Sequence, residues 1–247
     1  MQRRSPCTCL QAAALAAIAA WAAGCASGRG AKAPSAAPTA RAAPKRTVAQ
    51  VVAARGPAAD ARLAGPFQRA GVTYPPRKAY LLVFKRERKL ELWASDGGRP
   101  AFVRSYAVLA ASGRSGPKLR EGDLQVPEGL YWIVWLHPNS SYHFSIKLDY
   151  PNEFDRRQAR VDGRTGLGGD IFIHGSNLSI GCIAVGDRAI KELFVLAARA
   201  GIDHVPVIIA PSDLRRGPPP VLSRGAPLWT GQLYARIDTA LRPFQLR

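Results

Sequence analysis

The strongest constraint on the fold is a series of short apolar runs between residues 79 and 209. The run at 79–84 is continuously apolar, as in a strand that is buried on both faces, whereas 142–148 alternates between apolar and polar positions. Turn residues such as Asp96-Gly97-Gly98 separate the runs. Many short strands with little helix indicate a β-sandwich or an open barrel. Strands are expected at 79–84, 90–94, 102–109, 129–136, 142–148, 170–174, 182–185 and 205–209.

One clear helix interrupts this β pattern, so the expected fold class is mostly β with one or two helices (α+β). Its apolar positions recur with a helical period, at Ile190, Leu193, Phe194 and Ala197. Asp187 is a suitable N-cap, and Gly201 is a natural C-terminal stop.

Two further segments have weaker helical periodicity. Residues 46–71 favour one or two short helices, because Gly56-Pro57 and Gly65-Pro66 are expected to interrupt any longer one. Near the C-terminus, apolar residues at every fourth position predict a terminal amphipathic helix (Trp229, Leu233, Ile237 and Leu241).

The first 25 residues are typical of an export signal. Arg3 and Arg4 precede an apolar run at 10–23, which is too short for the ~20 residues that span a bilayer. The run ends in Ala22-Ala23-Gly24-Cys25, which resembles a bacterial lipobox except that Ala22 replaces the usual Leu. The resemblance implies that Cys25 is diacylated and anchored in the outer membrane. The alternative is cleavage at an Ala-rich site, which would release a soluble periplasmic protein.

These patterns divide the chain into four parts. We expect an export signal at 1–25 and a flexible Ala/Pro-rich tether with short helices at 26–74. The folded domain is expected at 75–211, and a basic, proline-rich C-terminal tail at 212–247.

The net charge of +18 indicates either attraction to a polyanion or an arginine-rich composition without a specific partner. The sequence has neither a zinc-ligand set nor an RNA-binding signature. Residues 113–118 lack the spacing of a phosphate-binding loop. With the export signal, these observations argue against a nucleic-acid partner.

Cysteine usage directs attention to one thiol. Cys7 and Cys9 lie in the segment that export removes, and Cys25 is either removed or lipidated. Cys182 is then the single thiol of the mature domain. A solitary thiol in an oxidising compartment is either an inert buried residue or a nucleophile.

The sequence around Cys182 is compatible with a nucleophile. His174 ends one predicted strand and Cys182 begins the next, so the short loop between them can bring the two side chains together. The imidazole would then take the thiol proton. The backbone N–H groups of Gly181 and Cys182 are candidate donors to an oxyanion. The alternative is a structural bend in which His174 and Cys182 are only packing residues.

The stretch at 170–187 resembles the active-site signature of the YkuD-type L,D-transpeptidases. The match comprises His174-Gly175 followed by Ser179-Ile180-Gly181-Cys182. It extends upstream to Arg120-Glu121-Gly122-Asp123 with Pro127-Glu128-Gly129-Leu130-Tyr131, and to Tyr150-Pro151-Asn152 with Asp155-Arg156. The resemblance covers about 75–210 and implies a mostly β YkuD-like fold.

The resemblance also implies a two-step acyl transfer. The Cys182 thiolate would attack a carbonyl next to meso-diaminopimelate in a peptidoglycan stem peptide and form a thioester. His174 would serve as base and then as acid, with neither a metal nor an organic cofactor. Ser179 and Gly175 are candidates for orientation, alongside the oxyanion donors. Arg120, Asn152 and Arg156 are candidates for binding substrate carboxylates.

Three departures from the usual pattern leave the direction of the reaction open. Ile180 replaces a second histidine, Ala184 replaces an arginine, and the spacing from His174 to Cys182 is short. These features resemble a subgroup in which some members are hydrolases that release wall-attached lipoprotein from diaminopimelate. The expectations are therefore an envelope transpeptidase, a related hydrolase that acts on lipoprotein or peptide, or a non-catalytic wall-binding lipoprotein.

Overall fold

The computed structural model describes residues 45–222 and 224–245. The export signal at 1–25, Cys25 and most of the predicted tether lie outside these residues. The described elements, in chain order, are α1 (Val48–Ala70), β1 (Lys78–Phe84), β2 (Lys89–Ser95), β3 (Ala101–Ala107), β4 (Ala110–Ala111), β5 (Gly129–His137), β6 (Ser145–Leu148), α2 (Glu153–Val161), β7 (Phe172–His174), β8 (Ile183–Ala184), α3 (Gly186–Ala200), η1 (Ile202–His204), β9 (Pro206–Ala210) and α4 (Thr230–Leu241).

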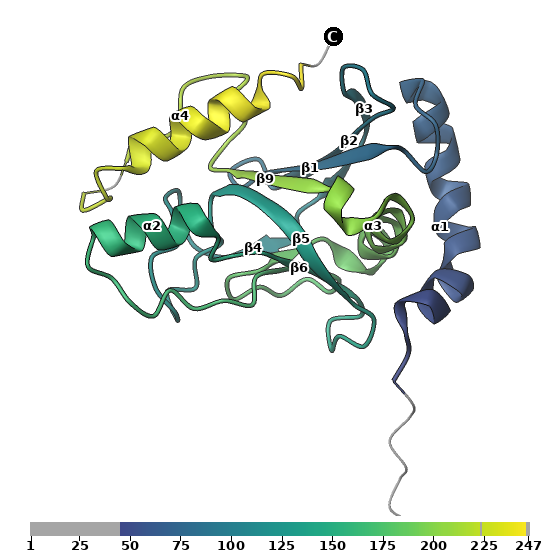
Figure 1. Cartoon of the computed structure of the whole chain (residues 1–247), viewed down its shortest axis with the longest axis horizontal. Helices are drawn as coiled ribbons and strands as arrows, with labels where there is room; N and C mark the ends of the chain where they lie inside the picture. Colours follow the sequence, from purple (N-terminus) through teal and green to yellow (C-terminus); the bar gives the residue numbers. More distant parts are fainter. Residues whose placement is uncertain (1–44, 223, 246–247) are drawn as a thin grey trace, which may run out of the picture. The chain divides into compact units, whose positions relative to one another are not determined.

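The strands form one curled, mixed sheet in the order β3-β2-β1-β9-β5-β6-β7-β8-β4 (Figure 1). The β1–β9 and β7–β8 pairs are parallel, and the other pairs are antiparallel. Every predicted run contains a strand, and the mostly β fold class is confirmed. The architecture corresponds to the open-barrel alternative, because a single sheet curls round instead of two sheets stacking.

Both faces of the central strands are buried. On β1, Leu81 and Val83 join a core cluster with α1 and α3, whereas Leu82 and Phe84 join a second cluster with α4. Figure 1 shows α1 and α3 together on one side of these strands and α4 on the other. Because successive strand residues point to opposite faces, this double cover explains why the 79–84 run is continuously apolar.

The predicted interruption of the N-terminal helical segment is wrong. The structure has one continuous helix, α1, with Pro57 and Pro66 inside it. A proline in a helix interior costs about 3 kcal/mol. Burial of Val51, Leu63 and Phe67 offsets this cost, since each large apolar side chain contributes about 1.5–3 kcal/mol. Tertiary packing therefore outweighs the local helix-breaking tendency.

The two other predicted helices are present. In α3 the predicted stripe is buried, and Gly201 is the C-cap. Asp187 is not the N-cap, however, because the helix begins at Gly186 and the Asp187 carboxylate accepts the Ser176 N–H at 2.9 Å. At the C-terminus, α4 buries Leu233, Ile237 and Leu241 against the sheet, as the spacing predicted.

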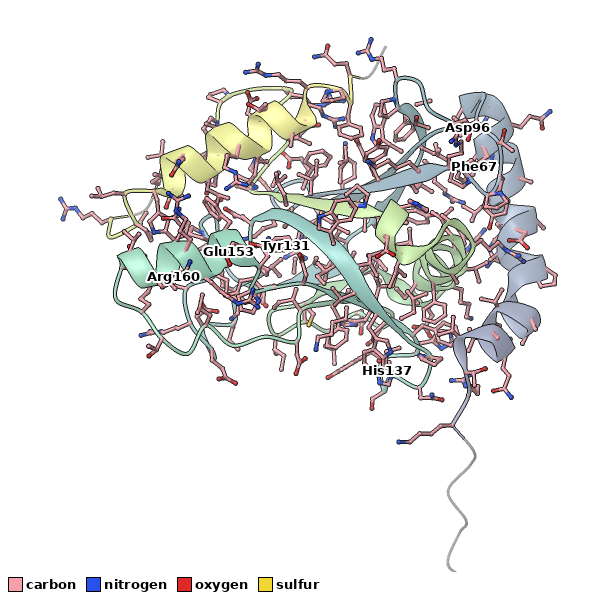
Figure 2. All side chains as sticks on the ribbon, in the orientation of Figure 1. Phe67, Asp96, Tyr131, His137, Glu153 and Arg160 are labelled. Carbon is pink, nitrogen blue, oxygen red and sulfur yellow. The ribbon has the colours of Figure 1, made fainter. Side chains whose placement is uncertain are left out.

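Sequence patterns did not indicate helix α2. Only Asp155, Gln158 and Ala159 are buried in it, so it lacks an apolar stripe. Figure 2 shows Glu153 and Arg160 on its outer face and Tyr131 on the neighbouring strand. The helix starts because Asn152 and Asp155 form a capping box.

Among the described helices, none combines the length and the apolar character that a bilayer span requires.

Candidate active site

The register of β7 and β8 places His174 and Cys182 on one side of the sheet. Ile173 pairs with Ile183 and His174 with Ala184 in this parallel pair. Ile173 and Ile183 are fully buried in the core. Because side chains alternate along a strand, His174 and Cys182 both point away from that core. The two strands run parallel, so the loop between them crosses back to the start of β8 and does not form a hairpin.

His174 is held in one orientation. Its ring is buried, lies 4.8 Å from the Tyr142 ring between centroids, and has Nδ1 2.6 Å from the Gly175 carbonyl oxygen. A carbonyl oxygen only accepts, so Nδ1 carries the proton and Nε2 keeps its lone pair. Burial lowers the pKa of His174, against the opposing effect of the Gly175 hydrogen bond. The result is a neutral imidazole whose Nε2 can accept a proton.

Cys182 is a protonated thiol in this arrangement. Burial raises its pKa and the Asp170 carboxylate adds to this, while the Phe172 N–H and the Lys118 ammonium oppose it. The side chain is partly accessible, and its Sγ donates to the Asp170 carbonyl oxygen at 3.6 Å. No hydrogen bond joins Sγ to His174. Proton transfer between the two residues therefore requires the thiol to leave the Asp170 carbonyl.

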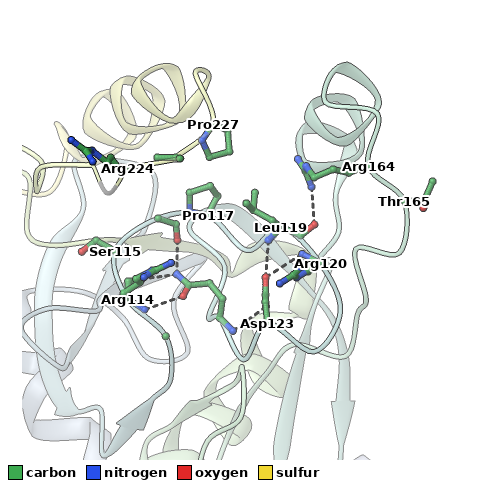
Figure 3. A pocket seen from close by; sticks show the side chains of 15 residues that line it. Arg114, Ser115, Pro117, Leu119, Arg120, Asp123, Arg164, Thr165, Arg224 and Pro227 are labelled. Carbon is green, nitrogen blue, oxygen red and sulfur yellow. Dashed lines mark hydrogen bonds between the residues drawn. The ribbon is translucent and has the colours of Figure 1, made fainter. Parts of the chain in front are cut away.

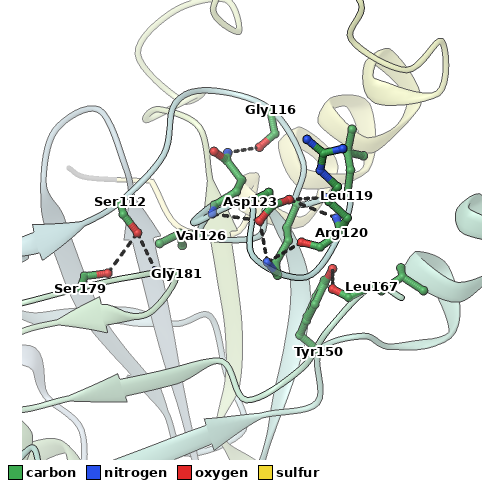
Figure 4. A network of polar contacts seen from close by, with 12 residues as sticks. Ser112, Gly116, Leu119, Arg120, Asp123, Val126, Tyr150, Leu167, Ser179 and Gly181 are labelled. Atoms are coloured by element: carbon green, nitrogen blue, oxygen red, sulfur yellow. Dashed lines mark hydrogen bonds and ion pairs between the residues drawn. The ribbon is translucent and has the colours of Figure 1, made fainter. Parts of the chain in front are cut away.

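The loop between the two residues is tightly connected. Ser179 Oγ donates to the Cys182 carbonyl oxygen at 2.5 Å. The Gly181 N–H donates to Ser112 Oγ at 2.6 Å, as Figure 4 shows. The Gly181 N–H is thus occupied, which corrects its assignment as a free oxyanion donor. Gly181 is required for another reason, because its φ of 114° is one that residues with a Cβ rarely adopt.

Gly175 is also a packing requirement. A Cβ at this position would lie 2.6 Å from Asp187 Oδ1 and 2.7 Å from the Tyr142 carbonyl oxygen. Such distances are shorter than real Cβ contacts. The glycine therefore allows the chain to pass between Asp187 and Tyr142 directly after His174.

Sequence analysis missed Ser112 as part of the site. Ser112 Oγ accepts the Gly181 N–H and lies 3.4 Å from Ser179 Oγ (Figure 4). The residue belongs to a loop far from Cys182 in the sequence. Tyr142 and Lys118 were missed for the same reason. Only the tertiary fold brings these positions together.

The predicted carboxylate-binding residues do not converge. Asn152 caps α2: its Oδ1 accepts the N–H groups of Phe154 and Asp155, and its Nδ2 donates to the Leu130 carbonyl. This structural role corrects its assignment to substrate. Arg156 is exposed on α2 and lines none of the described clefts. Arg120 is exposed and lines a large cleft formed by three segments of the chain.

Ile180 and Ala184, which replace a histidine and an arginine of the usual family pattern, have different surroundings. The Ile180 side chain is 76% exposed in the loop at 175–181, which precedes Cys182. Ala184 is fully buried in β8, which lies between β7 and β4 in the sheet. Within the described residues, no group of three or more His, Cys, Asp or Glu side chains is arranged to hold a metal ion.

A family model described as the L,D-transpeptidase catalytic domain (YkuD) matches residues 78–209, which is more than half of the chain. The chain belongs to this family. The matched region of the L,D-transpeptidase domain runs from β1 almost to the end of β9, so it includes His174, Cys182 and the Ser112 loop.

Individual relatives match part of the chain. Over 117 residues, 47% of the chain, it is 37% identical to "Putative L,D-transpeptidase YafK" of Escherichia coli strain K12, and this covers 45% of YafK. The chain thus spans about half the length of this relative. The helical cell shape determining protein Pgp2 from Campylobacter jejuni is 26% identical, with a TM-score of 0.45 over 55% of this chain and 48% of Pgp2. Bd1075 from Bdellovibrio bacteriovorus is 20% identical, with a TM-score of 0.40 over 69% of this chain and 56% of Bd1075.

Proposed function

We propose that this L,D-transpeptidase domain is an acyltransferase that acts on peptidoglycan stem peptides through a thioester at Cys182. The observation that carries the proposal is the pairing of β7 with β8. It puts a thiol and an oriented, neutral imidazole on the same side of the sheet. A partly buried thiol with a raised pKa is poorly nucleophilic by itself, so a neighbouring base has a defined task.

The first half of the reaction forms the thioester. Rotation about the Cα–Cβ bond of Cys182 moves Sγ from the Asp170 carbonyl toward Nε2 of His174, which takes the thiol proton. The sulfur then attacks the carbonyl carbon next to meso-diaminopimelate. The imidazolium returns its proton to the departing amine as the carbon–nitrogen bond breaks. The Gly175 carbonyl stabilises the imidazolium through Nδ1–H.

The second half releases the acyl group. His174, now neutral again, takes a proton from the incoming amine or water as that group attacks the thioester carbonyl. The carbon–sulfur bond then breaks, and the imidazolium returns the proton to the Cys182 sulfur. An amine acceptor gives transpeptidation, and water gives hydrolysis of a lipoprotein or peptide link. The hydrolytic alternative is kept because the sequence around Ile180 resembles a subgroup in which some members are hydrolases.

The proposed location is the cell envelope, with Cys25 as a lipid anchor in the outer membrane. The support is the sequence at 1–25. Metabolic labelling with a radioactive fatty acid should mark the wild-type protein in cells. Labelling that persists in Cys25→Ala would exclude this anchor.

Incubation of the purified protein with muropeptides, followed by mass spectrometry, tests the reaction. New cross-links between two diaminopimelate residues indicate transfer, and loss of an attached peptide indicates hydrolysis. Cys182→Ala should abolish either product. An electrophilic thiol probe separates both enzymes from a wall-binding lipoprotein. Labelling of Cys182 that depends on His174 supports catalysis, whereas an inert thiol would support the binding protein.

A further inference from the structure

A cleft of about 620 Å³ begins at Gly113, the residue after Ser112, which is hydrogen-bonded to the loop before Cys182. Three separate segments line it: the loop at 113–125, residues 164–165 after α2, and residues 224–227 before α4. Its volume falls within the range of small-ligand sites, roughly 300–1,000 Å³. Neither Cys182 nor His174 lines it, so the cleft is distinct from the reacting groups.

The lining is strongly basic. Four arginines contribute to it, and the single acidic residue is Asp123. The Asp123 carboxylate is already engaged within the protein. It accepts hydrogen bonds from the N–H groups of Leu119, Arg120 and Gln125, and it forms an ion pair with Lys118. The side chains of Arg114, Arg120 and Arg224 make no hydrogen bond or ion pair with any described residue. Their charges are available to a ligand.

Figure 3 shows the four arginines in two groups. Arg114 and Arg224 lie on one side of the cleft, and Arg120 and Arg164 on the other. Because the guanidinium fork matches a carboxylate, the arrangement fits a ligand with two carboxylates separated by a spacer.

The walls of the cleft are fixed before any ligand binds. Gln125 Nε2 donates to the carbonyls of Arg114 and Gly116, and Arg164 donates to the Leu119 carbonyl. The C-terminal segment is attached through Trp229, whose Nε1 donates to Asp162 at 2.8 Å, and Asp162 also pairs with Arg164. Preformed walls reduce the entropy that binding would otherwise cost.

The cleft and the nucleophile share one loop. Ser112 accepts the Gly181 N–H, and the next residue, Gly113, already lines the cleft. We propose that the cleft binds the carboxylates of an acidic peptide, and, on the basis of the proposed function, that this is the stem peptide engaged at Cys182. The C-terminal segment before α4 would then be part of substrate recognition and not only a surface covering.

Calorimetric titration of the full chain carrying Cys182→Ala tests this proposal. The probe is the tetrapeptide L-Ala-γ-D-Glu-meso-diaminopimelate-D-Ala, compared with its carboxamide analogue and with inorganic phosphate. Arg120→Gln/Arg224→Gln should weaken tetrapeptide binding at least about tenfold, since each removed charge contributes a charged hydrogen bond. Arg99→Gln/Arg242→Gln is the matched control, because it removes two exposed charges outside the cleft. It should leave binding unchanged.

The proposal would be overturned if Arg120→Gln/Arg224→Gln bound the tetrapeptide as tightly as the parent protein, or if the control variant lost as much affinity as the cleft variant. It would also be overturned if the carboxamide analogue bound as tightly as the tetrapeptide, or if phosphate displaced the tetrapeptide at similar concentration. The last would indicate a site for a small anion only. The rate of Cys182 alkylation, measured with the native thiol, should be unchanged in Arg120→Gln/Arg224→Gln. An inert Cys182 together with retained tetrapeptide binding would reject the proposed function and leave the cleft assignment standing.

Discussion

Nδ1 of His174 lies 2.6 Å from the carbonyl oxygen of Gly175, the next residue in the chain. This contact fixes the tautomer of the ring and leaves Nε2 as the proton acceptor. His174→Gln should therefore reduce turnover by about 10²–10⁴, the usual contribution of a general base. Muropeptide assays would measure this effect, with circular dichroism to verify folding. Retention of most activity in a folded His174→Gln protein would exclude His174 as the base.

The pH dependence of Cys182 alkylation should differ between the folded and unfolded chain. Burial raises the pKa of the native thiol, so less thiolate is present at a given pH than in the unfolded chain. The iodoacetamide rate should rise with pH in both states, with a higher midpoint in the native protein. The same protein in urea serves as the control. A native midpoint below the unfolded one would contradict the raised pKa.

Gly175→Ala should disrupt the site through packing alone. The new methyl group would overlap Asp187 Oδ1 and the Tyr142 carbonyl, so the backbone at His174 would have to shift. We expect a destabilisation of about 1–3 kcal/mol, typical of overpacking, and a loss of activity that exceeds the loss of folded protein. Urea unfolding and the muropeptide assay measure the two effects. Gly169→Ala is a matched control, since no atom lies within 4 Å of its Cβ position.

A buried ion pair supports the loop that carries Ser112. Lys85 Nζ lies 2.9 Å from Glu128 Oε1 and also donates to the carbonyls of Arg114 and Val126. Glu128→Gln should cost about 3–5 kcal/mol of stability, because it leaves a buried ammonium without its counter-ion. Lys85→Met/Glu128→Gln should cost less than the two single changes together. Additive losses in a urea double-mutant cycle would show that the two charges are not coupled.

Asp155 should make stability depend on pH. Burial raises its pKa from 3.8 to about 6, in spite of hydrogen bonds from Asn152 and Tyr131. The native state thus binds a proton more tightly than the unfolded state, and the resulting stabilisation, present below pH 3.8, is lost as the pH rises through 6. Two pKa units correspond to roughly 3 kcal/mol. Relative to wild type, Asp155→Asn should therefore gain stability from pH 4 to pH 7 in urea titrations. A constant difference across that range would refute the assignment.

Local patterns were sufficient for the strands and for α3 and α4, and they placed the candidate pair His174 and Cys182 at the ends of two strands. A strand or helix buried on one face repeats its apolar residues with a fixed period, and the motif around Cys182 lies within one short stretch. The same reasoning failed at α1, where local helix breakers were outweighed by burial of Val51, Leu63 and Phe67. It failed at Asn152 because a helix-capping role and a substrate-binding role use the same side-chain atoms.

The sequence by itself determined the order of the strands along the chain, the family motif and the identity of the candidate nucleophile and base. Only the tertiary structure decided which segments meet: Ser112 at the Gly181 N–H, and three distant segments around a basic cleft. The physical reason is the separation along the sequence of the residues that interact. Periodicity and capping depend on residues a few positions apart, whereas these contacts depend on how a curled sheet closes over long stretches of chain.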